Sequence, residues 1–312
     1  MDQDEAGGHP MITREAVREL FEARGFDDVG DGVRRIDGMD EEQYFAALNQ
    51  AQKDQDVLDD TITEIPTWST SAPAAWDGDL QHEHGMADPA LSGNDNLDAN
   101  RQYVQDQLHD AQAGGTDEMR HLGNATHALE DSYSQAHAWR DREAMAAGDP
   151  TAPVESINVW DPLPGWNAGP TGKGLSDEQG THDERFDHVG VDPTTGELTY
   201  GGDQAAAHAA AEMLIAHQDA KAMAPADAAS YVDGAVEPFY QGSDASVEVN
   251  DTATPAWRAE RDSRLDEVLG APHEKNTVEQ ARELLDDVTQ AVADGYATAS
   301  QTLSDAADEV TE

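Results

Sequence analysis

Residues 121–139 read HLGNATHALEDSYSQAHAW, and they carry the strongest structural signal in the chain. Ala, Leu, Glu and Gln, which all favour helices, dominate this stretch, and it contains no proline. The apolar residues Leu122, Ala125 and Leu129 recur at the spacing of one helix face. The stretch therefore predicts a central helix that ends only near Gly148.

One face of this helix carries a pair of side chains that can bind a metal. His127 and Asp131 are four residues apart, so they lie one turn apart on the same face. Imidazole and carboxylate are both zinc ligands, although a local hydrogen-bonded pair is the simpler reading of this spacing. On a continuous helix His137 would lie roughly 120° around the axis and about 9 Å beyond Asp131. It is therefore expected to serve a second ion, provided that the helix bends or ends there.

The same stretch resembles the central ligand motif of the zinc-dependent phospholipase C and single-strand-specific nuclease superfamily, especially its heterokaryon-incompatibility-type branch. In that motif the first His and the Asp bind one metal, and the last His binds another. His127, Asp131 and His137 occupy the matching positions, whereas Ala136 replaces the usual proline. The resemblance implies an all-α, phospholipase C-like helical bundle around a multinuclear site of two or three zinc ions.

The resemblance also assigns ligands upstream of the central helix. His9 precedes the sequence MITREAV and matches a metal-binding His at the start of the family's domain; an exposed loop histidine is the alternative. His84, within the sequence QHEHGMADP, matches a His that precedes an Asp-Pro pair, and His82 is the second candidate there. A solvated loop is the alternative for both.

Downstream of the central helix, the family has a His and a Glu four residues apart that complete the second metal site. His208 and Glu212 have this spacing, and a surface helical pair is the alternative. His182, in the long loop before them, is a rival for the same role. The expected metal ligands are therefore His9, His84, His127, Asp131, His137, His208 and Glu212, with His82 and His182 as alternatives.

The resemblance further implies a catalytic aspartate that contacts the nucleophilic water. Asp54 and Asp56 are the candidates, because they lie between the first two expected histidine ligands. The two residues are two apart on an expected helix at 39–60, so at most one of them faces a given site.

Composition points to a protein adapted to high salt. The chain has 65 acidic and 18 basic residues, which gives a net charge of −47. This charge causes strong self-repulsion in dilute buffer, whereas at molar salt the screening length falls to about 3 Å. We therefore expect a halophilic source and no strong binding to nucleic acid. The absence of cysteine excludes disulfides and thiolate ligands, so any metal must be held by His and carboxylate.

The 312 residues divide into three expected parts. Residues 1–240 carry all candidate ligands and form a metal-binding helical domain with a long loop and a small hairpin at 149–202. Residues 241–255 are small and polar and form a connector. Residues 256–312 form a C-terminal helical extension whose apolar stripe either packs back on the domain or mediates self-association. Further helices are expected at about 13–25, 95–113, from 203, and at 226–240.

Two functions are compatible with these features. The first is a metal-dependent hydrolase that acts on a phospholipid head group or another phosphodiester. The second is a structural or interaction module, such as a virion or assembly component, that keeps the fold with or without metals. The N-terminus lacks the basic and apolar regions of a signal peptide, and no apolar run is long enough to span a membrane. We therefore expect a cytoplasmic or virion-associated protein, although enzymes of this family are usually secreted.

Overall fold

The computed structural model describes residues 8–60, 82–88, 91–135, 137–159, 194–195, 198–199, 201–243 and 246–251. Most of these residues are helical, so the predominantly α-helical class expected from the sequence is confirmed. A small sheet accompanies the helices. The elements are α1 (His9–Arg24), α2 (Glu41–Asp60), the 3-10 helix η3 (His82–His84), α4 (Gly93–Gln112), α5 (Glu118–Asp131), β1 (Ala138–Arg140), α6 (Arg142–Ala146), β2 (Val154–Val159), α7 (Gly201–Ala220), α8 (Pro225–Val236), the 3-10 helix η5 (Glu237–Tyr240) and β3 (Glu248–Asp251).

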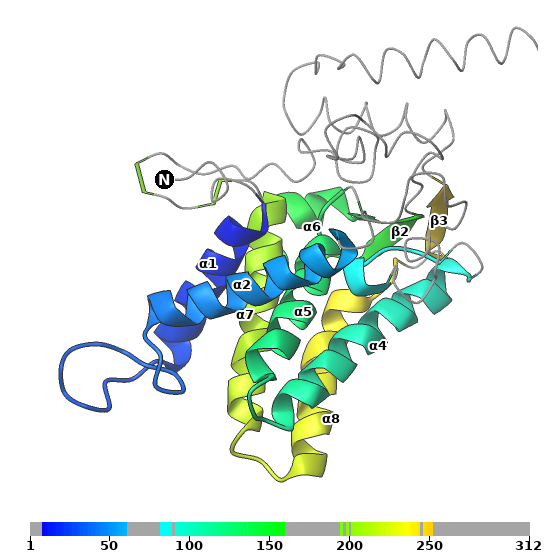
Figure 1. Ribbon diagram of the computed structural model, residues 1–312. Coiled ribbons are helices and arrows are strands. Elements are labelled where there is room, and N and C mark those ends of the chain that lie inside the picture. Colours follow the sequence, from blue (N-terminus) through cyan, green and yellow to red (C-terminus); the bar gives the residue numbers. More distant parts are fainter. Residues whose placement is uncertain are drawn as a thin grey trace, which may run out of the picture. The chain divides into compact units, whose positions relative to one another are not determined.

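The central helix of the bundle is α5, which packs against α2, α4 and α7 (Figure 1). Its apolar stripe, Leu122, Ala125 and Leu129, is fully buried, as the spacing predicted. Gly123 lets α2 approach closely, because a Cβ added there would lie 2.3 Å from the Cβ of Ala51. The helix that carries the candidate ligands His127 and Asp131 is therefore held in place by neighbours on several sides.

Helices α1 and α7 form the most extensive helix pair in the bundle and run in the same direction. Their direction is shown by two ion pairs, Glu19 with His208 and Arg24 with Asp219. The contact is close because α7 presents alanines such as Ala210 and Ala211, which bury little volume. Helix α1 starts at His9 after an N-cap at Gly8, four residues earlier than expected, because Pro10 is well tolerated in the first turn.

The sheet has the order β1-β2-β3 and lies at the end of the bundle where α5 finishes (Figure 1). Strands β1 and β2 are antiparallel, whereas β2 and β3 are parallel. None of these strands was expected. Part of the stretch interpreted as a loop after residue 149 is β2, and part of the stretch interpreted as a connector is β3.

The expected extension of the central helix to Gly148 is wrong, because α5 ends at Asp131. The buried Arg140 explains this end. Its guanidinium donates to the carbonyl oxygen of Ser132 at 2.8 Å and to Ser132 Oγ at 2.9 Å, so it takes the place of a further helical turn. The same group also donates to the carbonyl oxygens of Ala152 and Phe239. A cation at the C-terminus of a helix also interacts favourably with the helix dipole.

The chain divides into two compact units, Met1–Ala253 and Thr254–Glu312. The second unit lies outside the described residues, so the C-terminal extension at 256–312 stays a prediction. The hairpin expected at 191–202 is described only in part, and its last two residues, Gly201 and Gly202, belong to α7. Within the described part of the chain, no helix combines the length and apolar character that crossing a bilayer requires.

Candidate metal centre

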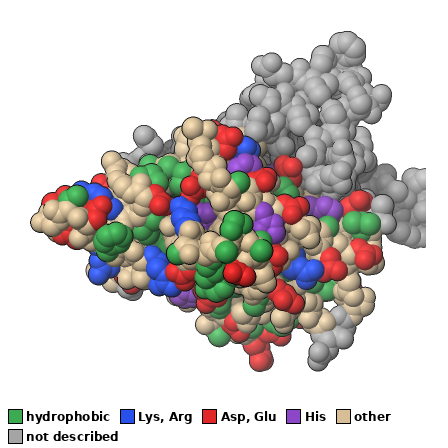
Figure 2. Space-filling model, turned by 90° about the horizontal axis from the view of Figure 1, so that it is seen from below, with side chains coloured by type: hydrophobic (Ala, Val, Ile, Leu, Met, Phe, Trp, Pro, Cys, Tyr) green, Lys and Arg blue, Asp and Glu red, His purple; other side chains and the backbone are tan. Residues whose placement is uncertain are grey.

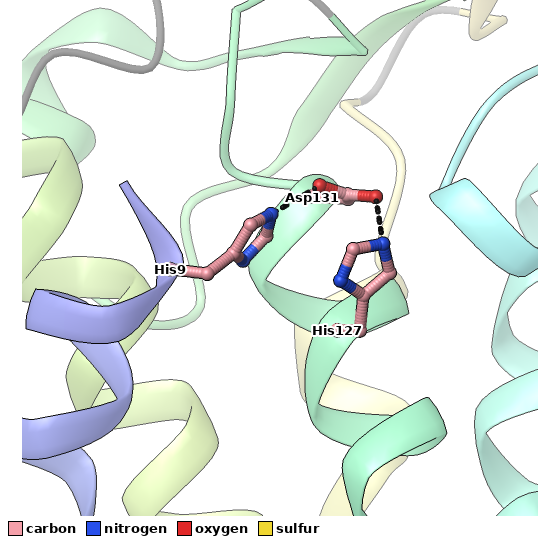
Figure 3. Close-up of side chains that lie close together, drawn as sticks. All are labelled: His9, His127 and Asp131. Carbon is pink, nitrogen blue, oxygen red and sulfur yellow. Dashed lines mark ion pairs between the residues drawn. The ribbon is translucent and has the colours of Figure 1, made fainter. Parts of the chain in front are cut away.

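Asp131 is the centre of a cluster of imidazole rings at the C-terminal end of α5. Its side chain is only 3% exposed. Its Oδ2 lies 3.2 Å from Nε2 of His127, one turn earlier on the same helix. Its Oδ1 lies 2.8 Å from Nε2 of His9, at the start of α1. One ligand atom from each of these three residues lies within 4.8 Å of the others, which is a suitable arrangement for a metal ion (Figure 3).

His84 adds a fourth side chain to this cluster. Its Nδ1 lies 3.2 Å from Asp131 Oδ2 and 3.1 Å from His127 Nε2. Together with the 3.2 Å between His127 and Asp131, these distances define a nearly equilateral triangle of two nitrogens and one oxygen. Ligands of a tetrahedral zinc ion, with bonds of about 2.0–2.1 Å, are about 3.3 Å apart. The edges of the triangle are therefore close to those that zinc requires.

The segment that carries His84 is held against α5 by its backbone. Gly85 has a φ of 64°, and a Cβ there would lie 3.1 Å from the carbonyl oxygen of Ala128. Asn158 of β2 fixes the other side, because its carbonyl accepts from the backbone N–H of Ala87 and its own N–H donates to the carbonyl of His137. Strand β2, which was not expected, therefore brings two candidate ligand segments together.

His137 also belongs to this region, because the chain turns back after α5. Its Nδ1 lies 2.5 Å from the carbonyl oxygen of His84 and 3.7 Å from Asp131 Oδ2. A carbonyl only accepts hydrogen bonds, so Nδ1 carries the proton. The expectation that His137 lies about 9 Å beyond Asp131 on a continuous helix is wrong, because α5 ends at Asp131. His137 instead fixes the backbone beside His84.

The electrostatics of the cluster favour positive charge. Burial opposes ionisation of Asp131, but the rings of His127, His137 and His9 outweigh it and lower its pKa well below the usual value. Burial likewise opposes protonation of His9, but Asp131 and Glu130 outweigh it and raise its pKa well above the usual value. The two adjacent carboxylates thus create a negative potential in which a divalent cation is stabilised.

Glu130 was missed by the sequence analysis. Its side chain is fully buried, and its Oε2 lies 2.8 Å from Nδ1 of His9. Thr13 Oγ1 lies 2.9 Å from Glu130 Oε1, and Gln52 Nε2 donates to Glu130 Oε2 at 3.1 Å. Its position between Leu129 and Asp131 was the available hint, but one glutamate among 65 acidic residues gives no specific signal.

His208 and Glu212 do not join this cluster. His208 Nδ1 pairs with Glu19 Oε1 at 2.8 Å, and its side chain is 44% exposed. Glu19 is ten residues after His9 on α1, which is about 15 Å along the helix axis. The Glu212 side chain is largely exposed. Partial desolvation of its carboxyl group raises its pKa, His208 opposes this, and the nearby Glu19 and Asp149 add to the rise. Within the part of the chain that the structure describes, neither residue belongs to a three-ligand group.

The remaining candidates occupy other positions. His82 is buried, and its Nε2 lies 3.2 Å from Asn96 Oδ1 on α4, so His84 is the histidine of this segment that reaches the cluster. Asp54 is exposed and accepts from Gln50 Nε2 at 2.7 Å. It lies roughly 200° around the helix from Gln52, which does reach the cluster. The Asp56 side chain and His182 lie outside the described residues.

Comparison with known proteins gives no function that could be transferred to this chain. No protein-family model, no curated protein and no solved structure matches this chain. The resemblance to phospholipase C-type enzymes therefore stays a prediction, and the conclusions supported by the structure are a mostly helical fold and a buried His/Asp cluster that could hold a metal ion.

Proposed function

We propose that this protein is a metal-dependent phosphoester hydrolase that uses zinc held by His9, His84, His127 and Asp131. The observation that carries the proposal is the triangle of His84 Nδ1, His127 Nε2 and Asp131 Oδ2, whose edges are 3.1–3.2 Å. A nitrogen and oxygen donor set without thiolate fits zinc, and the phospholipase C-like helical bundle is the fold that we propose with it.

The two oxygens of the Asp131 carboxylate face different candidate ligands. Its Oδ1 faces His9, and its Oδ2 faces His84 and His127. Zinc bound here would be held by Asp131 together with His9 next to Oδ1 and with His84 and His127 next to Oδ2. Zinc held by these residues would supply a Lewis acid for a phosphoryl oxygen and would lower the pKa of a nearby water.

The protein side chains define where a substrate can approach. The side chain of His9 is 29% exposed and that of His84 is 15% exposed, whereas His127 and Asp131 are each 3% exposed. The cluster is therefore open to solvent on the side of His9 and His84. The buried residues on the other side hold the ligand geometry and exclude water, which strengthens electrostatic interactions with a bound phosphate.

A compact phosphodiester, such as a phospholipid head group, is the proposed substrate class. A polyanion such as nucleic acid would meet repulsion over a wide area of a surface with net charge −47. A single phosphodiester carries one negative charge, so the ions of the site suffice to offset this repulsion.

The proposal is tested by metal analysis followed by assays in molar salt. Hydrolysis of bis-nitrophenyl phosphate and of nitrophenyl phosphocholine is measured for the wild type and for His127→Ala. Bound zinc together with turnover that is lost in the variant supports the hydrolase. If the wild type contains no zinc and hydrolyses neither substrate, the proposal is wrong, and a structural or assembly module becomes the better explanation.

A further inference from the structure

The carboxylate of Glu130 contacts Nδ1 of the His9 ring, whereas the candidate ligand Asp131 contacts Nε2. We propose, on the basis of the metal centre above, that Glu130 is a positioning residue that fixes the His9 imidazole so that its Nε2 faces the metal. Glu130 Oε2 lies 2.8 Å from His9 Nδ1, and Asp131 Oδ1 lies 2.8 Å from His9 Nε2. Two adjacent carboxylates thus hold the two nitrogens of one ring.

Helix geometry explains why two neighbours can do this. Successive residues of an α-helix point about 100° apart, so Glu130 and Asp131 leave α5 in different directions. Asp131 reaches Nε2 of the His9 ring, whereas Glu130 reaches Nδ1. Figure 3 shows the contact with Asp131. Glu130 is therefore placed to act on the ligand without binding the metal itself.

Glu130 is itself held by two other helices. Gln52 of α2 donates to Oε2 at 3.1 Å, and the Thr13 hydroxyl of α1 lies 2.9 Å from Oε1. The same hydroxyl lies 2.9 Å from Gln52 Oε1, so its single proton serves one acceptor at a time. A buried carboxylate is costly unless hydrogen bonds compensate it, and these partners provide that compensation. They also fix where Glu130 can accept from His9.

His9 needs such a partner because of its place in the fold. It is the first residue of α1, where the helix has no preceding turn to pack against the ring, and it is the most exposed of the proposed ligands. Histidine ligands generally donate their second N–H to a carboxylate or carbonyl, and loss of that partner weakens metal binding by about 10- to 100-fold. Glu130 provides this interaction for His9.

The test is the zinc affinity of Glu130→Gln, measured in molar salt by competition with a chromophoric chelator. We expect the dissociation constant to rise by about 10- to 100-fold. Glu118→Gln is the matched control, because Glu118 lies on the same helix and accepts from the ring of His217 at 3.1 Å. It removes a similar carboxylate–histidine pair about 18 Å away along α5, and its zinc affinity should equal that of the wild type.

A second measurement reports on the ring itself. In the zinc-loaded wild type, the His9 Nδ1 proton should give a slowly exchanging signal in a histidine ¹H–¹⁵N spectrum, and Glu130→Gln should speed its exchange with water. If this variant does not fold, Thr13→Val replaces it, because the loss of the hydroxyl releases Glu130 and should also weaken zinc binding.

The possible failures can be distinguished. A wild type that binds no zinc overturns the proposed metal centre, and this inference with it. A wild type that binds zinc overturns the role of Glu130 alone if the folded Glu130→Gln has the same dissociation constant and the same His9 signal. If Thr13→Val folds and Glu130→Gln does not, an unchanged dissociation constant for zinc in Thr13→Val overturns the role of Glu130.

Discussion

Nε2 of His9 lies 2.8 Å from Oδ1 of Asp131, so the start of the first helix meets the end of the central one. Neither residue can bind a metal firmly alone, because one imidazole or one carboxylate gives a weak site. The ring of His9 also lies against that of His127, with 4.6 Å between the ring centroids. The position of α1 relative to α5 is therefore expected to determine metal affinity as much as the ligands themselves.

Replacement of Asp131 by Asn should abolish zinc binding, because it removes the negative charge that His9, His84 and His127 share. We expect the dissociation constant for zinc to rise more than about 100-fold. This exceeds the effect of losing a residue that only hydrogen-bonds to a metal ligand. Metal content after dialysis against a known zinc concentration measures the change. His208→Ala serves as the comparison, and retention of zinc by Asp131→Asn would contradict the central role of this carboxylate.

Zinc should stabilise the folded protein, because the cluster joins residues from α1, η3 and α5 that separate on unfolding. A ligand at about 1,000 times its dissociation constant adds about 4 kcal/mol to the free energy of unfolding. The melting temperature should therefore rise with added zinc and fall with chelator at constant salt. Calcium at the same concentration is the control, and an equal effect of both ions would argue against a nitrogen-rich site.

Glu118 should make folding stability depend on pH in the acid range. The hydrogen bond from His217 lowers its pKa to about 2, with Lys221 adding to the effect and partial burial opposing it. Because the folded pKa lies below the unfolded value of 4.5, this stabilisation is complete above about pH 4.5 and is lost as the pH falls toward 2. The difference in unfolding free energy between the wild type and Glu118→Gln should shrink over that range. If the difference in unfolding free energy stays constant over this pH range, the ionised carboxylate of Glu118 is not the source of the stabilisation.

The close contact between α5 and α2 makes Gly123 sensitive to substitution. Gly123→Ala places a methyl group 2.3 Å from the Cβ of Ala51, and the helices must separate to accommodate it. We expect a loss of about 1–3 kcal/mol in the free energy of unfolding. Gly234→Ala is the control, because α8 has open space at that position and alanine should stabilise it by about 0.5–1 kcal/mol. Denaturant titration of both variants decides the question.

The surface charge predicts a requirement for salt. Asp and Glu side chains are dispersed over the face shown in Figure 2, with fewer Lys and Arg among them. Transfer from molar to about 0.1 M salt lengthens the screening distance from about 3 Å to about 10 Å, so repulsion between these groups grows. The melting temperature should fall on this transfer. An unchanged melting temperature would rule out the halophilic interpretation.

The sequence was informative where local patterns determine structure. The spacing of Leu122, Ala125 and Leu129 predicted the central helix, and the helices expected at 95–113 and from 203 begin within two residues of α4 and α7. For the site, spacing placed His127 beside Asp131, and the motif resemblance singled out His9 and His84, which the structure brings to the same carboxylate.

The features that were missed depend on distant contacts. The end of α5 is set by Arg140, whose partners include the carbonyl of Phe239, far along the chain. Strand β1 has three residues, too few to show alternation. The burial of Glu130 depends on Thr13 and Gln52 from other helices. No local pattern in a strongly acidic sequence distinguishes such a residue from a solvated one.

Asn158 of β2 has a consequence for the order in which this protein matures. It connects the backbone beside Ala87 to that of His137, and both segments precede it in the chain. The ribosome must therefore deliver the polypeptide through β2 before the pocket can close around an ion. At the proposed metal centre, zinc can therefore be held firmly only after about the first half of the 312 residues has been synthesised.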